Sequence, residues 1–140
     1  MTALDTNVIV RYLVNNEEEQ AEAARALLEG MTADRPGFIC REVAIEVVWV
    51  LERFYRFTRA QIADILVELI ATDSLVVEAA DDIARAAVVY RGQAGVGFAD
   101  LMILLAAARS GALPLYTFDR KLARMEGTIL AEGVAGSEPP

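Results

Sequence analysis

Short apolar runs alternate along the chain with longer segments whose apolar residues recur every three or four positions. The short runs are typical of buried strands and the longer segments of amphipathic helices. Strands are expected at residues 1–4, 38–40, 75–77, 113–117 and 128–130, and helices from residue 8 onward and at 17–30, 41–54, 58–70, 81–90 and 98–110, with a brief helix between 118 and 127. This alternation favours an α/β protein with a central parallel sheet and helices on both faces.

Polar residues mark several of the expected helix starts. Asn15 and Asn16 are expected to cap the helix that begins with three glutamates, and Thr58 is expected to cap another. Asp81 and Asp82 are expected to be solvated acids in the first turn of a helix. One domain should span residues 1–132, and residues 133–140, which offer little to bury, are expected to form a flexible tail.

Composition restricts the chemistry. The chain has 140 residues, no histidine and one cysteine, which excludes a Ser-His-Asp triad, a Cys-His pair, a histidine-ligated metal site and an internal disulfide. Its 13 basic and 21 acidic residues give a net charge of −8, which disfavours capture of a polyanion by a basic surface. Catalysis, if present, must therefore use carboxylates and hydroxyls.

The chain is 55% hydrophobic, so a membrane segment has to be considered. The longest apolar stretches are interrupted by Glu46 and Asp100 and fall short of the ~20 residues that span a bilayer. The N-terminus has no basic region before an apolar run, unlike a signal peptide. We therefore expect a cytoplasmic protein without a membrane segment, and the apolar excess suggests a surface covered by a partner.

Four acids stand out by position. Asp5 and Asp119 follow predicted strands, whose carboxyl ends open on one edge of a parallel sheet, while Glu46 and Asp100 lie in apolar helices. Carboxylates that lose water require a cation or strong donors, and oxygen ligands suit Mg²⁺ or Mn²⁺. Each acid also has a purely structural explanation. Asp5 and Asp119 could cap a turn, and Asp100 could be stabilised by the dipole at the start of its helix. Glu46 could lie on a solvent-exposed helix face together with Glu42, one turn earlier.

Four segments carry a family resemblance: Asp5-Thr6-Asn7, Glu46 before Val-Val-Trp-Val-Leu-Glu, Phe98-Ala99-Asp100 and Thr117-Phe118-Asp119-Arg120. In order and spacing they resemble the PIN-domain nucleases, especially VapC-type toxins, from residue 1 to about residue 130. The resemblance implies a three-layer α/β/α sandwich and an endoribonuclease that uses Mg²⁺, with Mn²⁺ able to substitute. It implies that Asp5, Glu46 and Asp100 bind the metal and that Asp119 closes the cluster directly or through water. Thr117 and Asn7 would support the site.

The toxin resemblance also implies a homodimer and a small antitoxin that lies across an apolar groove, with the exposed helical surface of residues 43–70 as the candidate groove. Many relatives carry a further acid where this chain has Gly97, a departure that could weaken metal binding. Phosphate contacts are expected from basic residues close to the acids in sequence, namely Arg11, Arg120, Lys121 and Arg124. Arg53, Arg56 and Arg59 could instead form a solvated face or a partner surface.

Two other functions are open. A receiver-like phosphoryl-transfer domain would carry a second acid next to Asp5 or two residues after it, where Thr6 and Asn7 stand, and a lysine at a late strand end, whereas Lys121 lies past Asp119. A noncatalytic PIN-like interaction module would use the same acids to bind a structural ion or a partner's basic side chain. Cleavage of RNA with and without a chelator distinguishes the enzyme from this module.

Overall fold

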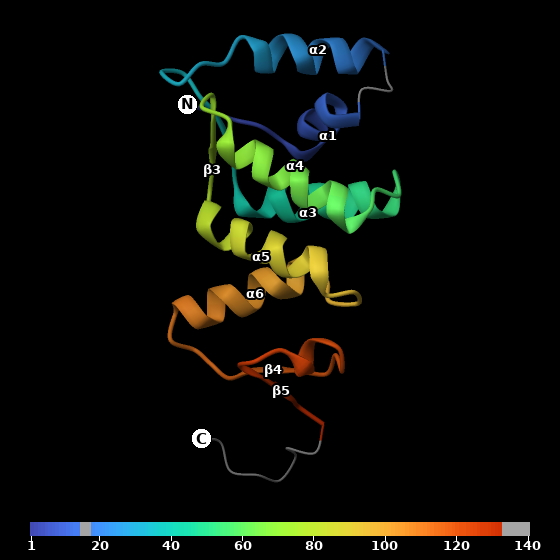
Figure 1. Cartoon of the computed structure of the whole chain (residues 1–140). Coiled ribbons are helices and arrows are strands. Elements are labelled where there is room, and N and C mark those ends of the chain that lie inside the picture. The colour runs from blue at the N-terminus through green and yellow to red at the C-terminus, as the bar shows by residue number, and fades with distance from the viewer. Residues whose placement is uncertain (15–17, 133–140) are drawn as a thin grey trace.

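The computed structural model describes residues 1–14 and 18–132. In this part of the chain the elements follow the order β1 (Thr2–Ala3), α1 (Thr6–Val14), α2 (Glu18–Glu29), β2 (Gly37–Ile39), α3 (Arg41–Arg53), α4 (Arg59–Ala71), β3 (Leu75–Val77), α5 (Ala80–Gly92), α6 (Phe98–Arg109), β4 (Leu115–Thr117), the 3₁₀ helix η1 (Leu122–Arg124) and β5 (Thr128–Leu130). Figure 1 shows the helices stacked from α2 at one end to α6, with β4 and β5 beyond α6. The strand and helix order predicted from the sequence is confirmed, with small shifts at the element ends.

The strands pair in parallel, as predicted, but they form two separate sheets. One sheet has the order β1-β2-β3 and the other consists of β4 and β5. The α/β class is therefore confirmed, whereas the single central sheet expected from the sequence is found in two parts. Strands of two or three residues form few ladder hydrogen bonds, so packing of neighbouring elements decides where they lie. Both β4 and β5 contact η1. Gly127, which precedes β5, lies next to Leu104 of α6 and next to Leu113, which precedes β4.

The core lies between the helices and the three-stranded sheet. Helix α3 buries Ala44, Val47, Val48 and Leu51, which are spaced as one helical face. Helix α5 contacts both α4 and α6, and α1 contacts α2 and α3. Within the described ranges every helix is too short or too polar to traverse a lipid bilayer.

The starts of α4 and α1 show one expectation confirmed and one shifted. Thr58 caps α4 as predicted: its hydroxyl accepts a hydrogen bond from the Gln61 backbone N–H at 3.1 Å, and the Gln61 side chain accepts one from the Thr58 N–H at 2.8 Å. Helix α1 begins at Thr6, two residues before the expected start. The capping roles expected for Asn15 and Asn16 and the flexible tail at 133–140 lie outside the described residues.

Candidate active site

Asp5 and Glu46 are brought together by the start of α1 and the middle of α3. Both acids line a cavity of about 420 Å³ together with Asn7 and Arg11. Thr6 is 6% exposed, and its hydroxyl donates a hydrogen bond to Oε1 of Glu46. The Asp5 Oδ1 accepts a hydrogen bond from the Thr6 N–H at 2.7 Å. Thr6 therefore contacts both carboxylates, a role that sequence reasoning missed because a threonine after Asp5 looks like part of a capping turn.

Asp100 and Asp119 form a second pair. Asp100 lies in the first turn of α6, and burial raises the pKa of its carboxyl, with a further increase from the negative charge of Asp119. The Asp119 Oδ1 accepts hydrogen bonds from the N–H groups of Lys121 at 2.8 Å and Leu122 at 3.1 Å, so Asp119 also holds the turn that leads into η1. Thr117 accepts a hydrogen bond from the Asp119 N–H at 3.0 Å and fixes the turn that carries this acid.

Glu46 connects the two pairs. Besides the cavity that it shares with Asp5, it lines a second cavity of about 520 Å³ between α3 and the start of α6. Gly97, Phe98 and Ala99, the residues directly before Asp100, line that second cavity. Glu46 thus shares one cavity with Asp5 and a second cavity with the residues that lead into Asp100.

In residues 1–14 and 18–132 no three acidic or cysteine side chains lie close enough together to form a ready-made metal site. The expected cluster of four carboxylates therefore stays a prediction, and the structure presents the acids as two pairs. The donors nevertheless fit a hard divalent cation, since Mg²⁺ is usually held by one or two carboxylates, waters and substrate phosphate. The raised pKa of Asp100 fits as well, because a cation would relieve the repulsion between Asp100 and Asp119.

A tightly held loop connects α5 to Asp100. The Arg59 Nη1 donates hydrogen bonds to the backbone carbonyls of Tyr90 at 3.0 Å, Gln93 at 3.1 Å and Val96 at 2.9 Å. At Gly95, which has φ +90°, an added Cβ would lie 2.6 Å from the Lys121 side chain. The loop before Asp100 is thus held by Arg59 and covered by the side chain of Lys121.

The other basic residues near the acids have mixed surroundings. Arg11 donates hydrogen bonds to the Gln20 side chain at 2.6 Å and to the Tyr55 hydroxyl at 3.2 Å while it lines the Asp5 cavity. Arg120 pairs with Glu132 at 2.5 Å on the surface. Of the residues expected to contact phosphate, Arg11 is therefore the one that shares a cavity with Asp5 and Glu46, and neither the Lys121 side chain nor exposed Arg124 lines it.

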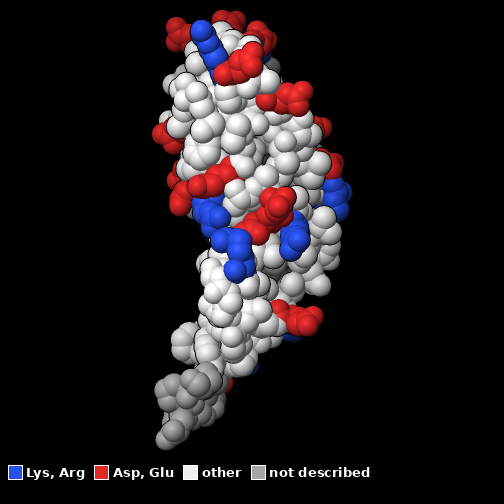
Figure 2. All heavy atoms as spheres, turned by 90° about the vertical axis from the view of Figure 1, so that its left-hand side faces the viewer, with Lys and Arg blue, Asp and Glu red and all other residues white. Residues whose placement is uncertain are grey.

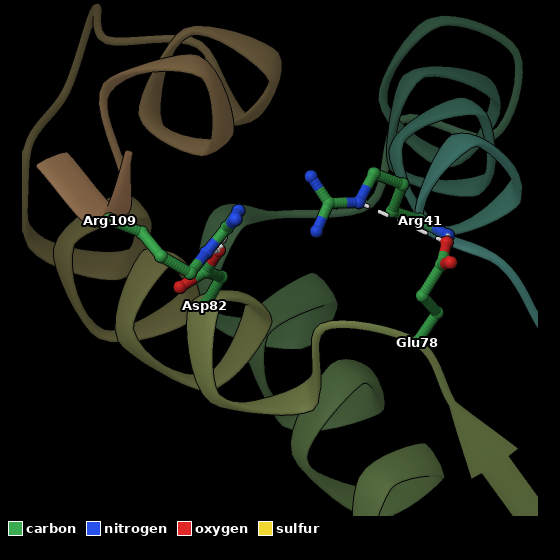
Figure 3. A network of polar contacts seen from close by, with 4 residues as sticks. All are labelled: Arg41, Glu78, Asp82 and Arg109. Atoms are coloured by element: carbon green, nitrogen blue, oxygen red, sulfur yellow. Dashed lines mark hydrogen bonds and ion pairs between the residues drawn. The ribbon is translucent and has the colours of Figure 1, made fainter. Parts of the chain in front are cut away.

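A separate polar network lies at the start of α5. Figure 3 shows Arg41 reaching from α3 toward Glu78, and Arg109 reaching Asp82. Asp82, expected as a solvated acid, is instead 13% exposed and bound to Arg109 at 2.8 Å, because the end of α6 packs beside the start of α5. On the face shown in Figure 2, basic and acidic side chains interleave across the middle of the molecule. Arg109 is at the opposite end of α6 from Asp100, so this network stabilises helix packing rather than the candidate site.

Comparisons with known proteins agree with this arrangement. The model of the PIN domain family matches residues 2–127. A VapC ribonuclease of Aquifex aeolicus (strain VF5) is 31% identical over 127 residues, covering 89% of this chain and 92% of the relative. No solved structure gives a significant match. The resemblance inferred from the four acidic segments is confirmed, and the chain belongs to the PIN domain family.

Proposed function

We propose that this chain is an endoribonuclease that cleaves RNA phosphodiester bonds with a metal-activated water and that it acts as the toxin of a toxin–antitoxin pair. The observation that carries the proposal is the position of Glu46, which lines one cavity with Asp5 and a second cavity with Gly97, Phe98 and Ala99, the residues directly before Asp100. The name of the Aquifex aeolicus relative, a VapC ribonuclease, supports the same activity.

The side chains of this chain have separate roles in the proposed reaction. Asp5, Glu46 and Asp100 would hold Mg²⁺, with Mn²⁺ as a substitute, and Asp119 would close the site. Thr6 keeps Glu46 oriented through its buried hydroxyl. When bound, the ion would lower the pKa of a water and neutralise charge on the scissile phosphate. The RNA phosphate would lie in the Asp5 cavity near Arg11, whose planar guanidinium suits phosphate oxygens.

Cleavage of a mixed RNA pool tests the proposal. The wild-type protein should cleave with Mg²⁺ or Mn²⁺ and stop in EDTA, whereas Asp5→Asn and Asp100→Asn should lose cleavage and keep the fold. Asp73→Asn is the matched control, because Asp73 lies exposed in a turn outside the cavities. An active Asp100→Asn protein would contradict the assignment.

A second function, the noncatalytic PIN-like module, is favoured by one observation: the described residues hold two pairs of acids rather than a cluster of three. This module would bind Mn²⁺ or a basic peptide through the same acids without cleaving any RNA in the pool. Binding of Mn²⁺ measured by electron paramagnetic resonance, set beside the cleavage assay, separates the two functions.

We also propose a homodimer and an antitoxin as protein partners. An apolar cavity of about 250 Å³ lies between α1 and α2, and it shares Asn7 and Arg11 with the Asp5 cavity. Together with the exposed surface of residues 43–70, it would accept a helix or strand that aims a basic side chain at Asp5 and Glu46. Growth arrest on expression of the wild type, but not of Asp100→Asn, tests the toxin, and light scattering tests the dimer.

A further inference from the structure

Asp100 and Asp119 belong to two parts of the chain that are held in different ways. Asp100 follows the loop of residues 93–97, which Arg59 fixes from one side. Asp119 lies in a turn of the C-terminal part of the fold, where β4, η1 and β5 contact mainly each other. In the described part of the chain no hydrogen bond joins this loop to that turn. Packing of side chains therefore has to keep the two acids at a fixed distance.

The charges of the two acids work against this arrangement. Asp119 raises the pKa of the Asp100 carboxyl, so the two carboxylates are close enough to repel each other. The repulsion lasts until a cation binds beside them, because only an opposite charge removes it. The metal-free chain therefore needs a contact that keeps the loop and the turn from separating.

The side chain of Lys121 makes such a contact. At Gly95, in the middle of the loop, an added Cβ would lie 2.6 Å from Cδ, 3.1 Å from Nζ and 3.2 Å from Cε of Lys121. Three atoms of this side chain thus lie directly on the glycine, which has φ +90° and no Cβ to keep them away. The apolar stem of a lysine packs in this way while its ammonium group stays in water.

The backbone from which this side chain extends is fixed at the acid. The Lys121 N–H donates the hydrogen bond of 2.8 Å to Oδ1 of Asp119. The next residue, Leu122, is 3% exposed and belongs to the hydrophobic core. Lys121 thus binds Asp119 through its backbone and covers the loop before Asp100 through its side chain.

We propose that Lys121 is a positioning residue whose stem packs on Gly95 and thereby holds Asp100 and Asp119 together for a divalent cation. This inference rests on the proposed function, and it gives Lys121 a role other than the phosphate contact expected from the sequence. Gly95 is part of the same contact, because a side chain at this position would push the lysine stem off the loop.

Binding of Mn²⁺ followed by electron paramagnetic resonance tests the contact without RNA. Lys121→Ala should weaken Mn²⁺ binding about tenfold, as is typical of residues that orient metal ligands. Lys121→Met should stay within about twofold of the wild type, because methionine places its sulfur where lysine has Cδ and keeps the packing. Arg85→Ala, which removes an exposed cation from α5, is the control for net charge.

Substitutions of glycine test the other side of the contact. Gly95→Ala should lose as much Mn²⁺ affinity as Lys121→Ala, because the added methyl group displaces the lysine stem. Gly111→Ala is the matched control: Gly111 also has a positive φ, +69°, but an added Cβ there would meet no described atom within 4 Å apart from its chain neighbours. The double variant with Gly95→Ala and Lys121→Ala should bind Mn²⁺ as Lys121→Ala does, because both changes break one contact.

Hydrogen exchange of the metal-free protein gives a readout that needs neither the ion nor RNA. Lys121→Ala and Gly95→Ala should each speed the exchange of amides in residues 93–97 and 119–122, because the loop and the turn no longer hold each other. Gly111→Ala should leave both segments as in the wild type.

Four results would overturn the proposal. These are unchanged Mn²⁺ affinity in both single alanine variants, losses that multiply in the double variant, Lys121→Met as weak as Lys121→Ala, and Gly111→Ala as weak as Gly95→Ala. The third result would assign the effect to the charge of Lys121, and the fourth would assign it to backbone strain at a glycine.

Cleavage assays separate this proposal from the function on which it rests. High Mn²⁺ concentrations should restore RNA cleavage by Lys121→Ala to the wild-type maximum, whereas a lost phosphate contact would leave the rate low at any Mn²⁺ concentration and contradict the positioning role. A wild type that cleaves no RNA contradicts the nuclease. If the Mn²⁺ losses are still found, the contact between Lys121 and Gly95 keeps its role at the acids.

Discussion

Arg59 offers the sharpest test of how the fold positions Asp100. Its Nη1 reaches three backbone carbonyls in residues 90–96, and its guanidinium carbon lies 4.3 Å from the centroid of the Tyr90 ring, which is fully buried. Replacement by methionine keeps much of the apolar stem and removes the donors and the charge. The end of α5 and the loop before Asp100 then lose the group that holds them together.

The magnitude follows from these contacts. A hydrogen bond from a charged donor contributes ~1.5–3 kcal/mol and a cation–π contact ~0.5–2 kcal/mol. The three carbonyls share the two hydrogens of Nη1 and the site is partly open to water, so we expect Arg59→Met to lower the free energy of unfolding by about 2–4 kcal/mol. For a chain of this size that corresponds to a fall in Tm of roughly 6–20 °C.

Two assays check the reasoning. Thermal unfolding followed by circular dichroism measures stability, and Mn²⁺ titration at a temperature where the variant is folded should show an affinity about tenfold weaker, as for other residues that position metal ligands. Arg59→Lys should keep part of the cation–π contact and lie between wild type and Arg59→Met in both assays. Arg35→Met, at an exposed turn, is the matched control. An Arg59→Met protein with the Tm and Mn²⁺ affinity of the wild type would refute the role of this loop.

Three further substitutions test the acids. Asp100→Asn should raise the Tm of the metal-free protein at pH 7, because burial and the charge of Asp119 raise the pKa of Asp100 and make its charged form less stable in the folded chain than in the unfolded one. The gain should shrink as the pH falls through the raised pKa and vanish below the ordinary value near ~4, and an equal gain at pH 3 would contradict the prediction. Thr6→Val should leave the Tm nearly unchanged, because Glu46 is exposed and water replaces the lost hydroxyl as its donor. RNA cleavage should fall by about tenfold, because the Glu46 carboxylate is no longer held in place. Unreduced cleavage would rule out a role of Thr6 in positioning Glu46. Gly97→Asp should strengthen Mn²⁺ binding, because φ −73° accepts a side chain and an added Cβ would lie 3.4 Å from the Asp100 Oδ2, which places a second carboxylate beside the first. Gly97→Asn is the uncharged control. Equal Mn²⁺ affinity of the two variants would contradict the prediction.

Features that depend only on residues close together in the sequence could be predicted from it. The capping box at Thr58 needs only two residues three positions apart, and the buried face of α3 needs only regular spacing of apolar residues, so both could be predicted from the sequence. The order of strands and helices follows for the same reason. Asp5 and Asp119 could be chosen because they follow predicted strands, and Glu46 and Asp100 because an acid within an apolar helix is unusual.

Distant contacts could not be predicted. The partner of Thr6 is 40 positions away, and Arg59 reaches carbonyls 31 to 37 positions away. Nothing beside Arg59 in the sequence distinguishes it from the exposed Arg53 and Arg56. The separation of β4 and β5 from the other strands could not be predicted either, because a strand of three residues carries too few alternating positions to specify its neighbour.

The hydrogen bonds of the four acids divide them into two kinds. Asp5, Glu46 and Asp119 each accept hydrogen bonds from groups of their own chain, which hold their carboxylates in place. In the described ranges the Asp100 carboxylate has no such donor, and burial and the negative charge of Asp119 raise its pKa. Because no group of the described chain donates to the Asp100 carboxylate, under the proposed function a bound cation contributes more there than at the three acids that already accept hydrogen bonds. The fixed acids would set the position of the metal, while Arg59 and the loop that it holds would bring Asp100 to it.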